Sequence, residues 1–189
     1  MQVVNLIAEV LKKEGIKYLS AFPTTPVIEG AARVGIRPII CRQERVGVGI
    51  ADGYSRVTNG APPGVFAMQY GPGAENAFAG VATAYSDGVP MLLLPLGHPM
   101  DRDGIFPHFN SVKNYGSVIK HAEYVTSVQR VVPALRRAFS RIKMGRPGPV
   151  LVEIPADLAV TEVDCGLPET YSTTPKTSSQ GDPRDIEAA

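Results

Sequence analysis

The sequence predicts an α/β protein with an open, doubly wound and mainly parallel β-sheet. Short apolar segments, such as "GVFAMQ" and "MLLLPL", alternate along the chain with longer segments that have helical periodicity. The apolar segments are nearly continuous, which is typical of parallel strands that are buried on both faces. This alternation is expected of a parallel sheet with helices covering both of its faces.

The pattern predicts each element in turn. Helices are expected over residues 2–15, 26–34, 44–58, 73–86 and 128–144. Strands are expected over residues 18–22, 37–41, 64–69, 91–96 and 148–154, with an edge strand over 120–126 and an irregular segment from His98 to about Ser117. We assign residues 1–158 to one domain and the Ser-, Thr- and Pro-rich residues 159–189 to a linker. The last residues, "GDPRDIEAA", predict a turn that leads into a further element, so we expect the protein to continue.

Composition excludes several function classes. The 189 residues carry a net charge of +1, which gives no electrostatic reason to expect nucleic acid or an anionic membrane as a partner. No run of about 18 apolar residues predicts a membrane span. Cys41 and Cys165 form neither a disulfide scaffold nor a zinc motif, which favours a reduced, cytoplasmic protein. The three histidines lack metal-ligand spacing, so we expect no metal held by this chain alone.

Turn-forming and polar residues follow four of the predicted strands. They are "FPTTP" (22–26), "RQE" (42–44), "YGPGAEN" (70–76) and "GHPM" (97–100). Ligands bind in the crevice outside the carboxyl ends of the strands of such sheets. The sequence therefore predicts a functional site where these segments meet, with Pro23, Thr24 and Thr25 on its first segment.

Glu44 stands at the start of a predicted helix that also contains Gly47, Gly49 and Gly53. Each glycine costs a helix about 1 kcal/mol relative to alanine. Glu44 has two interpretations, a charge that favours the helix N-terminus or a functional carboxylate. The glycines also have two interpretations. They allow tight packing within this chain, or they allow a ligand, a ring or another helix to approach closely.

The segment "GPGAEN" places Pro72 where a helix can begin, between Gly71 and Gly73, with Asn76 one turn later. It is either a strand-to-helix turn or a point where backbone approaches a ligand closely. Its likeness to the dinucleotide motif G-x-G-x-x-G is imperfect, and no acidic ribose partner follows, so we do not predict a dinucleotide site. His98 follows a strand on the same edge, where it is either a proton donor or a loop histidine without a role.

Three segments together identify a family resemblance: "RQERVGVGIADGYSRVTNG", "GPGAENAFAGVATAYSDGVPMLLLPLG" and "GRPGPVLVEIPADL". In this order they resemble the N-terminal pyrimidine-binding domain of thiamine diphosphate enzymes of the acetolactate synthase, pyruvate oxidase and benzoylformate decarboxylase family. The resemblance runs over about residues 1–158. It implies that residues 159–189 lead to a central domain that is absent from this chain.

The resemblance implies roles for the predicted site residues. A glutamate at the place of Glu44 hydrogen-bonds N1′ of the cofactor's aminopyrimidine and favours the tautomer that takes the proton from C2. The rim residues that it marks as cofactor-binding are Pro23, Thr24, Thr25, Glu44, Gly71, Pro72, Gly73 and Asn76. His98 replaces the glutamine typical of acetolactate synthases, so we expect Glu44 and His98 as catalytic residues of a carboligase or of a decarboxylase or other lyase acting on a small 2-oxo acid.

The resemblance also implies what this chain does not hold. Relatives bind Mg²⁺ and the cofactor's diphosphate through a G-D-G motif followed by Asn-Asn, which this sequence lacks. We therefore expect a diphosphate-binding domain of another subunit as partner, in a homodimer or homotetramer, with FAD admitted as a further cofactor of a central domain. The alternative hypothesis is a non-catalytic binding or regulatory module that retains the fold.

Overall fold

A computed structural model describes residues 1–164, 166–177 and 181–189, so Cys165 and part of the linker prediction lie outside the described residues. Six strands form one parallel sheet in the order β2-β1-β3-β4-β6-β5. They are β1 (Tyr18–Ala21), β2 (Arg37–Ile40), β3 (Gly64–Met68), β4 (Met91–Gly97), β5 (His121–Tyr124) and β6 (Pro149–Pro155). The predicted fold class is confirmed.

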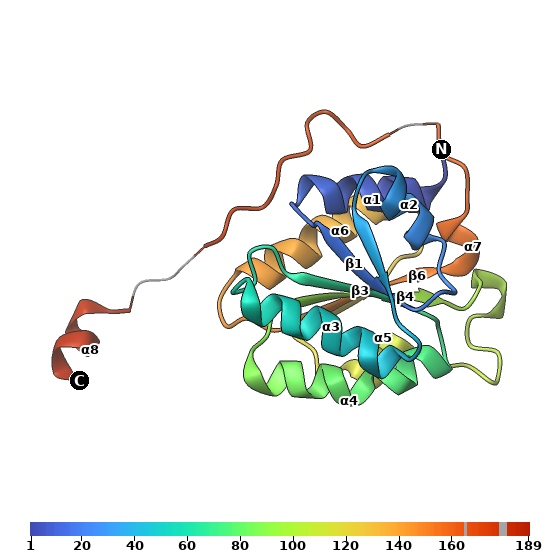
Figure 1. Cartoon of the computed structure of the whole chain (residues 1–189). Helices are drawn as coiled ribbons and strands as arrows, with labels where there is room; N and C mark the ends of the chain where they lie inside the picture. The colour runs from blue at the N-terminus through green and yellow to red at the C-terminus, as the bar shows by residue number, and fades with distance from the viewer. Residues whose placement is uncertain (165, 178–180) are drawn as a thin grey trace.

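Helices cover both faces of the sheet (Figure 1). On one face lie α1 (Val3–Lys13), α2 (Val27–Arg33) and α6 (Val128–Lys143), and on the other α3 (Glu44–Val57), α4 (Pro72–Asp87) and α5 (Ser111–Tyr115). Short segments complete the chain: the 3-10 turn η1 (Met100–Arg102), α7 (Ala156–Ala159) and α8 (Pro183–Ala188). Among the described residues, no helix has the length and apolar character needed to cross a membrane.

The inner strands β3, β4 and β6 are fully buried, because helices cover both faces of the sheet. All residues of β3, β4 and β6 are buried. Two hydrophobic clusters result, one on each face; the larger joins α1 and α6 to the sheet, and the smaller joins α3, α4 and α5 to it. Continuous apolar runs in the sequence are therefore explained by burial on both sides.

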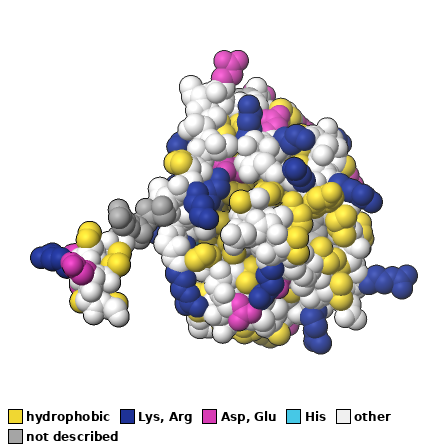
Figure 2. Space-filling view, turned by 60° about the vertical axis from the view of Figure 1, so that its left-hand side comes forward, with side chains coloured by type: hydrophobic (Ala, Val, Ile, Leu, Met, Phe, Trp, Pro, Cys, Tyr) yellow, Lys and Arg dark blue, Asp and Glu magenta, His cyan; other side chains and the backbone are white. Residues whose placement is uncertain are grey.

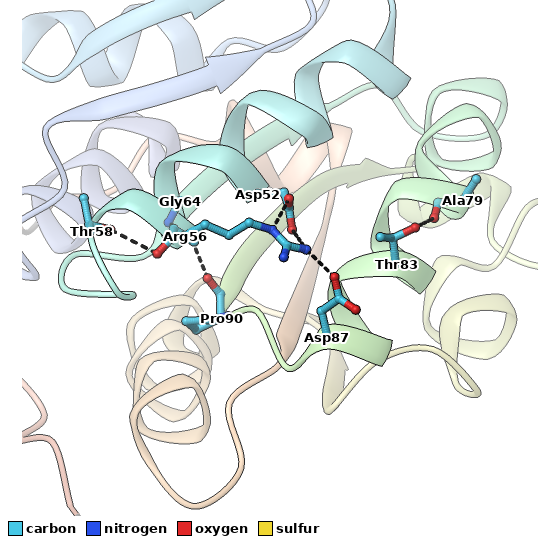
Figure 3. A network of polar contacts seen from close by, with 9 residues as sticks. Asp52, Arg56, Thr58, Gly64, Ala79, Thr83, Asp87 and Pro90 are labelled. Atoms are coloured by element: carbon cyan, nitrogen blue, oxygen red, sulfur yellow. Dashed lines mark hydrogen bonds and ion pairs between the residues drawn. The ribbon is translucent and has the colours of Figure 1, made fainter.

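Helices α3 and α4 lie in close contact along their lengths. A Cβ at Gly80 of α4 would come 2.3 Å from Val48 Cγ1 of α3. At their C-terminal ends, Arg56 donates to Asp52 Oδ2 at 2.8 Å and to Asp87 Oδ2 at 2.6 Å (Figure 3). Exposed ion pairs add little stability, so Arg56 mainly fixes how the two helices meet.

Residues beyond the last strand are tied to the domain by a buried carboxylate. The Glu14 side chain is fully buried; it receives a hydrogen bond from Tyr171 Oη at 2.7 Å and lies 2.6 Å from Lys143 Nζ. Lys143 Nζ also donates to Thr174 O at 2.8 Å. Burial and this hydrogen bond to Glu14 raise the pKa of Tyr171. The segment around 171–174 is thus anchored on α1 and α6, although the division into domain and linker stays a prediction.

Glu14→Ala is expected to lower the free energy of unfolding by about 2–3 kcal/mol, because it leaves the mostly buried Lys143 ammonium without its counter-charge. It should also release residues 171–174, seen as faster amide exchange there. Urea denaturation measures the first effect. The control is Glu162→Ala, since Glu162 is exposed and its pair with the N-terminus contributes little. Equal midpoints for the two variants would contradict the anchoring role of Glu14.

Candidate functional site

The candidate site lies at the carboxyl edge of the sheet, where the strand order reverses. Strand β1 pairs with β2 on one side and with β3 on the other. The connections that leave β1 and β3 therefore run in opposite directions along the sheet, which makes this edge its switch point. Crevices at such switch points are where α/β sheets bind their ligands.

Glu44 is the first residue of α3 and is buried at this edge, with only 6% of its surface exposed. Its Oε2 accepts a hydrogen bond from Asn76 Nδ2 of α4 at 2.8 Å. Its Oε1 lies 2.8 Å from the point where a Cβ at Gly73 would stand. The neighbouring Arg42 and Arg45 are exposed instead. Glu44, Gly73 and Asn76, which the sequence predicted separately, are thus brought into direct contact.

The turn at residues 71–73 makes this contact available. Gly71 has φ 59° and ψ −115°, a backbone conformation that residues with a Cβ rarely adopt, and Pro72 then begins α4. Tyr115 of α5 is fully buried and its hydroxyl donates to Ala74 O. Burial raises the pKa of Tyr115, so the hydroxyl stays a donor. The first turn of α4 is held rigidly against the site.

The first turn of α3 is held by the sheet beneath it. Ser20 Oγ of β1 donates to Gly47 O at 2.8 Å. A Cβ at Gly47 would come 2.3 Å from Phe66 Cε2 and 2.7 Å from Cys41 Sγ. Burial, and in smaller part the Glu44 carboxylate, raises the pKa of Cys41, whose thiol stays uncharged. Gly47 therefore serves packing within the chain, which seats Glu44 at the edge.

Gly49 and Gly53 differ from Gly47. A Cβ at either position would meet nothing within 4 Å. They lie on the side of α3 that carries Val46 and Val57, which are 52% and 88% exposed. The three glycines that looked equivalent in the sequence thus divide into one that packs inside the chain and two that face away from it.

The segment after β1 contributes residues of two kinds. Pro23 and Thr24 are exposed on the rim, where Thr24 N donates to Phe22 O at 2.8 Å in a tight turn. Thr25 is only 5% exposed, and its Oγ1 accepts from Val27 N at 3.3 Å at the start of α2. Thr25 thus shapes the turn, whereas Pro23 and Thr24 are accessible to a ligand.

His98 follows β4 and lies across the 71–73 turn from Glu44. Its ring stands 4.6 Å from that of Tyr70, which follows β3. Residues from this turn and from the segment after β4 enclose a pocket of about 300 Å³, lined by Gly71, Pro72, Glu75, His98, Phe106, Pro107, His108 and Phe109. The pocket and Glu44 share the first turn of α4, so one ligand could reach both.

Sequence reasoning missed three features of this edge. Helix α5 lies in the segment expected to be irregular; its signal was Asn110, whose side chain accepts from Lys113 N at 2.8 Å as a cap. The position of His108 could not be predicted from the sequence, and this residue lines the pocket. Glu153 is 3% exposed at the end of β6, and burial raises its pKa to about 7. Its signal was one acidic residue within the apolar run "PVLVEIP".

Among the described residues, no group of three or more His, Cys, Asp or Glu side chains is placed to hold a metal ion. The arrangement at Glu44 suits an organic ring instead: a buried, oriented carboxyl group beside backbone that lacks side chains at positions 71 and 73. Fold and site together define an open α/β domain with a buried, hydrogen-bonded carboxyl group at its switch point.

Comparison with known proteins gives the family. The model of the thiamine pyrophosphate enzyme N-terminal TPP-binding domain matches residues 1–122, and this chain belongs to that family. The resemblance predicted from the sequence is confirmed.

Several acetolactate synthases are similar to this chain. The large subunit of acetolactate synthase from Haemophilus influenzae is 33% identical over 160 residues, which cover 81% of this chain and 27% of the relative. The isozyme 3 large subunit from Escherichia coli is 31% identical, covering 82% and 28%. Acetolactate synthase 2 from Nicotiana tabacum is 33% identical, covering 82% and 24%. The chain spans about a quarter of the length of these relatives.

Proposed function

We propose that this chain supplies the pyrimidine-binding half of a thiamine diphosphate site in an enzyme that acts on a small 2-oxo acid. The reaction is an acetolactate synthase-like carboligation or a decarboxylation. The observation that carries the proposal is the buried Glu44 carboxyl group, oriented by Asn76 at the switch point of the sheet. Family membership and the acetolactate synthase relatives support it.

The residues of the site fit the aminopyrimidine. Glu44 would hold or exchange a proton at N1′, since its other oxygen is already oriented by Asn76. A Cβ at Gly71 would meet nothing within 4 Å, so the ring would find open space against the backbone there, while Gly73 makes room for the Glu44 carboxyl group itself. Pro23 and Thr24 lie on the opposite rim. When bound, thiamine diphosphate supplies the electron sink for the chemistry of the 2-oxo acid. His98 would contact the substrate from the neighbouring pocket.

We propose that the diphosphate and Mg²⁺ are held by a diphosphate-binding domain of another subunit. The sequence contains no G-D-G motif followed by Asn-Asn. FAD, if the full protein uses it, would be held largely by a central domain. The free, buried thiol of Cys41 accords with the cytoplasmic location that we propose.

The proposed contact between subunits, in a homodimer or homotetramer, involves the exposed side of α3. Figure 2 shows hydrophobic side chains gathered on part of one face of the folded body, with Lys and Arg around them. Exposed apolar residues near α3 are Tyr18, Ile40, Val46 and Val57. Contiguous exposed apolar surface usually marks an interface, and Gly49 and Gly53 would let a facing helix approach closely.

Thiamine diphosphate is expected to bind the isolated 189-residue chain at least about 100-fold more weakly than it binds the chain assembled with a diphosphate-binding domain. The charged end of the cofactor, and the affinity that it contributes through Mg²⁺, would be missing from the isolated chain. Calorimetry with Mg²⁺ present measures both affinities. Tight binding to the isolated chain would contradict the half-site, and no binding to the assembly would contradict the proposed function.

A further inference from the structure

Two imidazole rings line the pocket beside Glu44, and only one of them was predicted. The ring centroids of His98 and His108 lie 4.8 Å apart, and Tyr70 covers the other side of His98 at 4.6 Å. Both histidines are partly buried and line the pocket of about 300 Å³ described above. The two rings are therefore close enough for the charge of one to govern the charge of the other.

One hydrogen bond points to the tautomer of His98. The backbone N–H of Phe109 donates to His98 Nε2 over a long distance of 3.5 Å. A nitrogen that accepts carries no proton, so the neutral ring has its proton on Nδ1. His98 is thus left with Nδ1–H as a donor.

His108 has a carboxylate beside it. Its Nε2 lies 3.1 Å from Asp103 Oδ1, so the Asp103 carboxylate stands next to the ring that packs on His98. Asp103 therefore fixes the ring of His108 beside His98, in the same way that a carboxylate orients a histidine in other sites.

The charged and titratable groups around His98 oppose a second proton on it. Burial lowers the pKa of His98 most, followed by electrostatic repulsion from His108 and Arg102, while Asp103 acts in the other direction. Glu75 of α4 lines the pocket and Tyr70 packs on the His98 ring, while the carboxyl group of Glu153 lies beside Gly97, the residue before His98. Since the pKa falls below its ordinary value, His98 is uncharged at neutral pH and gains charge only on acidification.

We propose that His108, held by Asp103, is a positioning residue that keeps His98 neutral, so that His98 offers Nδ1–H to a carbonyl or carboxylate oxygen of a small substrate in this pocket. The identity of that substrate rests on the proposed function. The arrangement of His98, His108 and Asp103 does not, because it is built entirely from this chain.

The pair is tested in the isolated chain by long-range ¹H–¹⁵N NMR of histidine, which is tractable with only three histidines. His98 is expected to show a proton on Nδ1 at pH 7.5 and to titrate below the ordinary histidine range. His108→Gln should move the titration of His98 to higher pH, because it removes the neighbouring imidazole that opposes a second proton on His98. Asp103→Asn should move it to lower pH. His121→Gln, on β5 and outside the pocket, should leave it unchanged.

A proton on Nε2 of His98 in the unaltered chain would overturn the proposal. It would also be overturned if His98 titrated at the same pH in the His108→Gln variant as in the unaltered chain. The first readout needs no variant, so misfolding of a variant leaves the test intact. In the assembled enzyme, His108→Gln should move the acidic limb of the pH–rate profile to higher pH, whereas a merely structural loss would lower the rate equally at every pH. Absence of cofactor binding would refute the proposed function without altering the NMR result.

Discussion

Gly47→Ala is expected to lower the free energy of unfolding by about 2–3 kcal/mol, whereas Gly49→Ala should raise it by up to about 1 kcal/mol. Both substitutions add one methyl group to the same helix. At position 47 that methyl would stand 2.3 Å from Phe66 Cε2, and Phe66 is fully buried against the sheet. At position 49 it would meet nothing in the chain, so only the gain in helix propensity remains. Urea denaturation of the isolated chain measures the difference.

Gly49 and Gly53 then test the proposed interface. If a helix of a second copy approaches them closely, Gly49→Ala and Gly53→Ala should weaken self-association while stabilising the monomer. Sedimentation at several concentrations separates the two effects. A Gly47→Ala variant with an unchanged urea midpoint would contradict the packing of α3 on β3. Self-association that is equally strong in the Gly49→Ala and Gly53→Ala variants and in the unaltered chain would contradict the interface.

Much of the fold could be predicted, because a strand that is buried on both faces appears in the sequence as a nearly continuous run of apolar residues. Strands β3 and β4 are continuous apolar runs that are each followed by a turn-forming segment, and β6 is an apolar run broken only by Glu153. The meeting of those segments at one edge follows from parallel pairing alone. Contact of Glu44 with Asn76 does not, since it depends on how closely α3 and α4 approach.

Other parts of the site could not be predicted, for two physical reasons. The place of His108 depends on the path of an irregular segment, which has no periodicity to interpret. The division among the glycines depends on which side of α3 faces β3. Gly47 shares a side with Ala51 and Ser55, both buried, whereas Gly49 and Gly53 share a side with Val46 and Val57. Helical spacing could have separated them, once the buried side was known.

Glu44→Gln is expected to lower turnover of the assembled enzyme by about 10²–10⁴-fold, the usual contribution of a positioned acid or base. The amide keeps an oxygen that can accept from Asn76, so the fold and the urea midpoint should change little. What is lost is the exchangeable carboxyl proton. The matched control is Glu29→Gln, another glutamate in the first turn of a helix, which is exposed on α2 and should retain full activity.

We propose that the Glu44 carboxyl group would hold or exchange a proton at N1′ of the bound aminopyrimidine, which would favour loss of the proton at C2 of the cofactor. The direct measurement is hydrogen–deuterium exchange at C2 of thiamine diphosphate bound to the assembled enzyme, with cofactor occupancy checked for each variant. The account predicts exchange slowed by about 10²-fold or more in Glu44→Gln and unchanged in Glu29→Gln. Equally fast exchange in Glu44→Gln and the unaltered enzyme would reduce Glu44 to a charge at the start of a helix and would contradict the account.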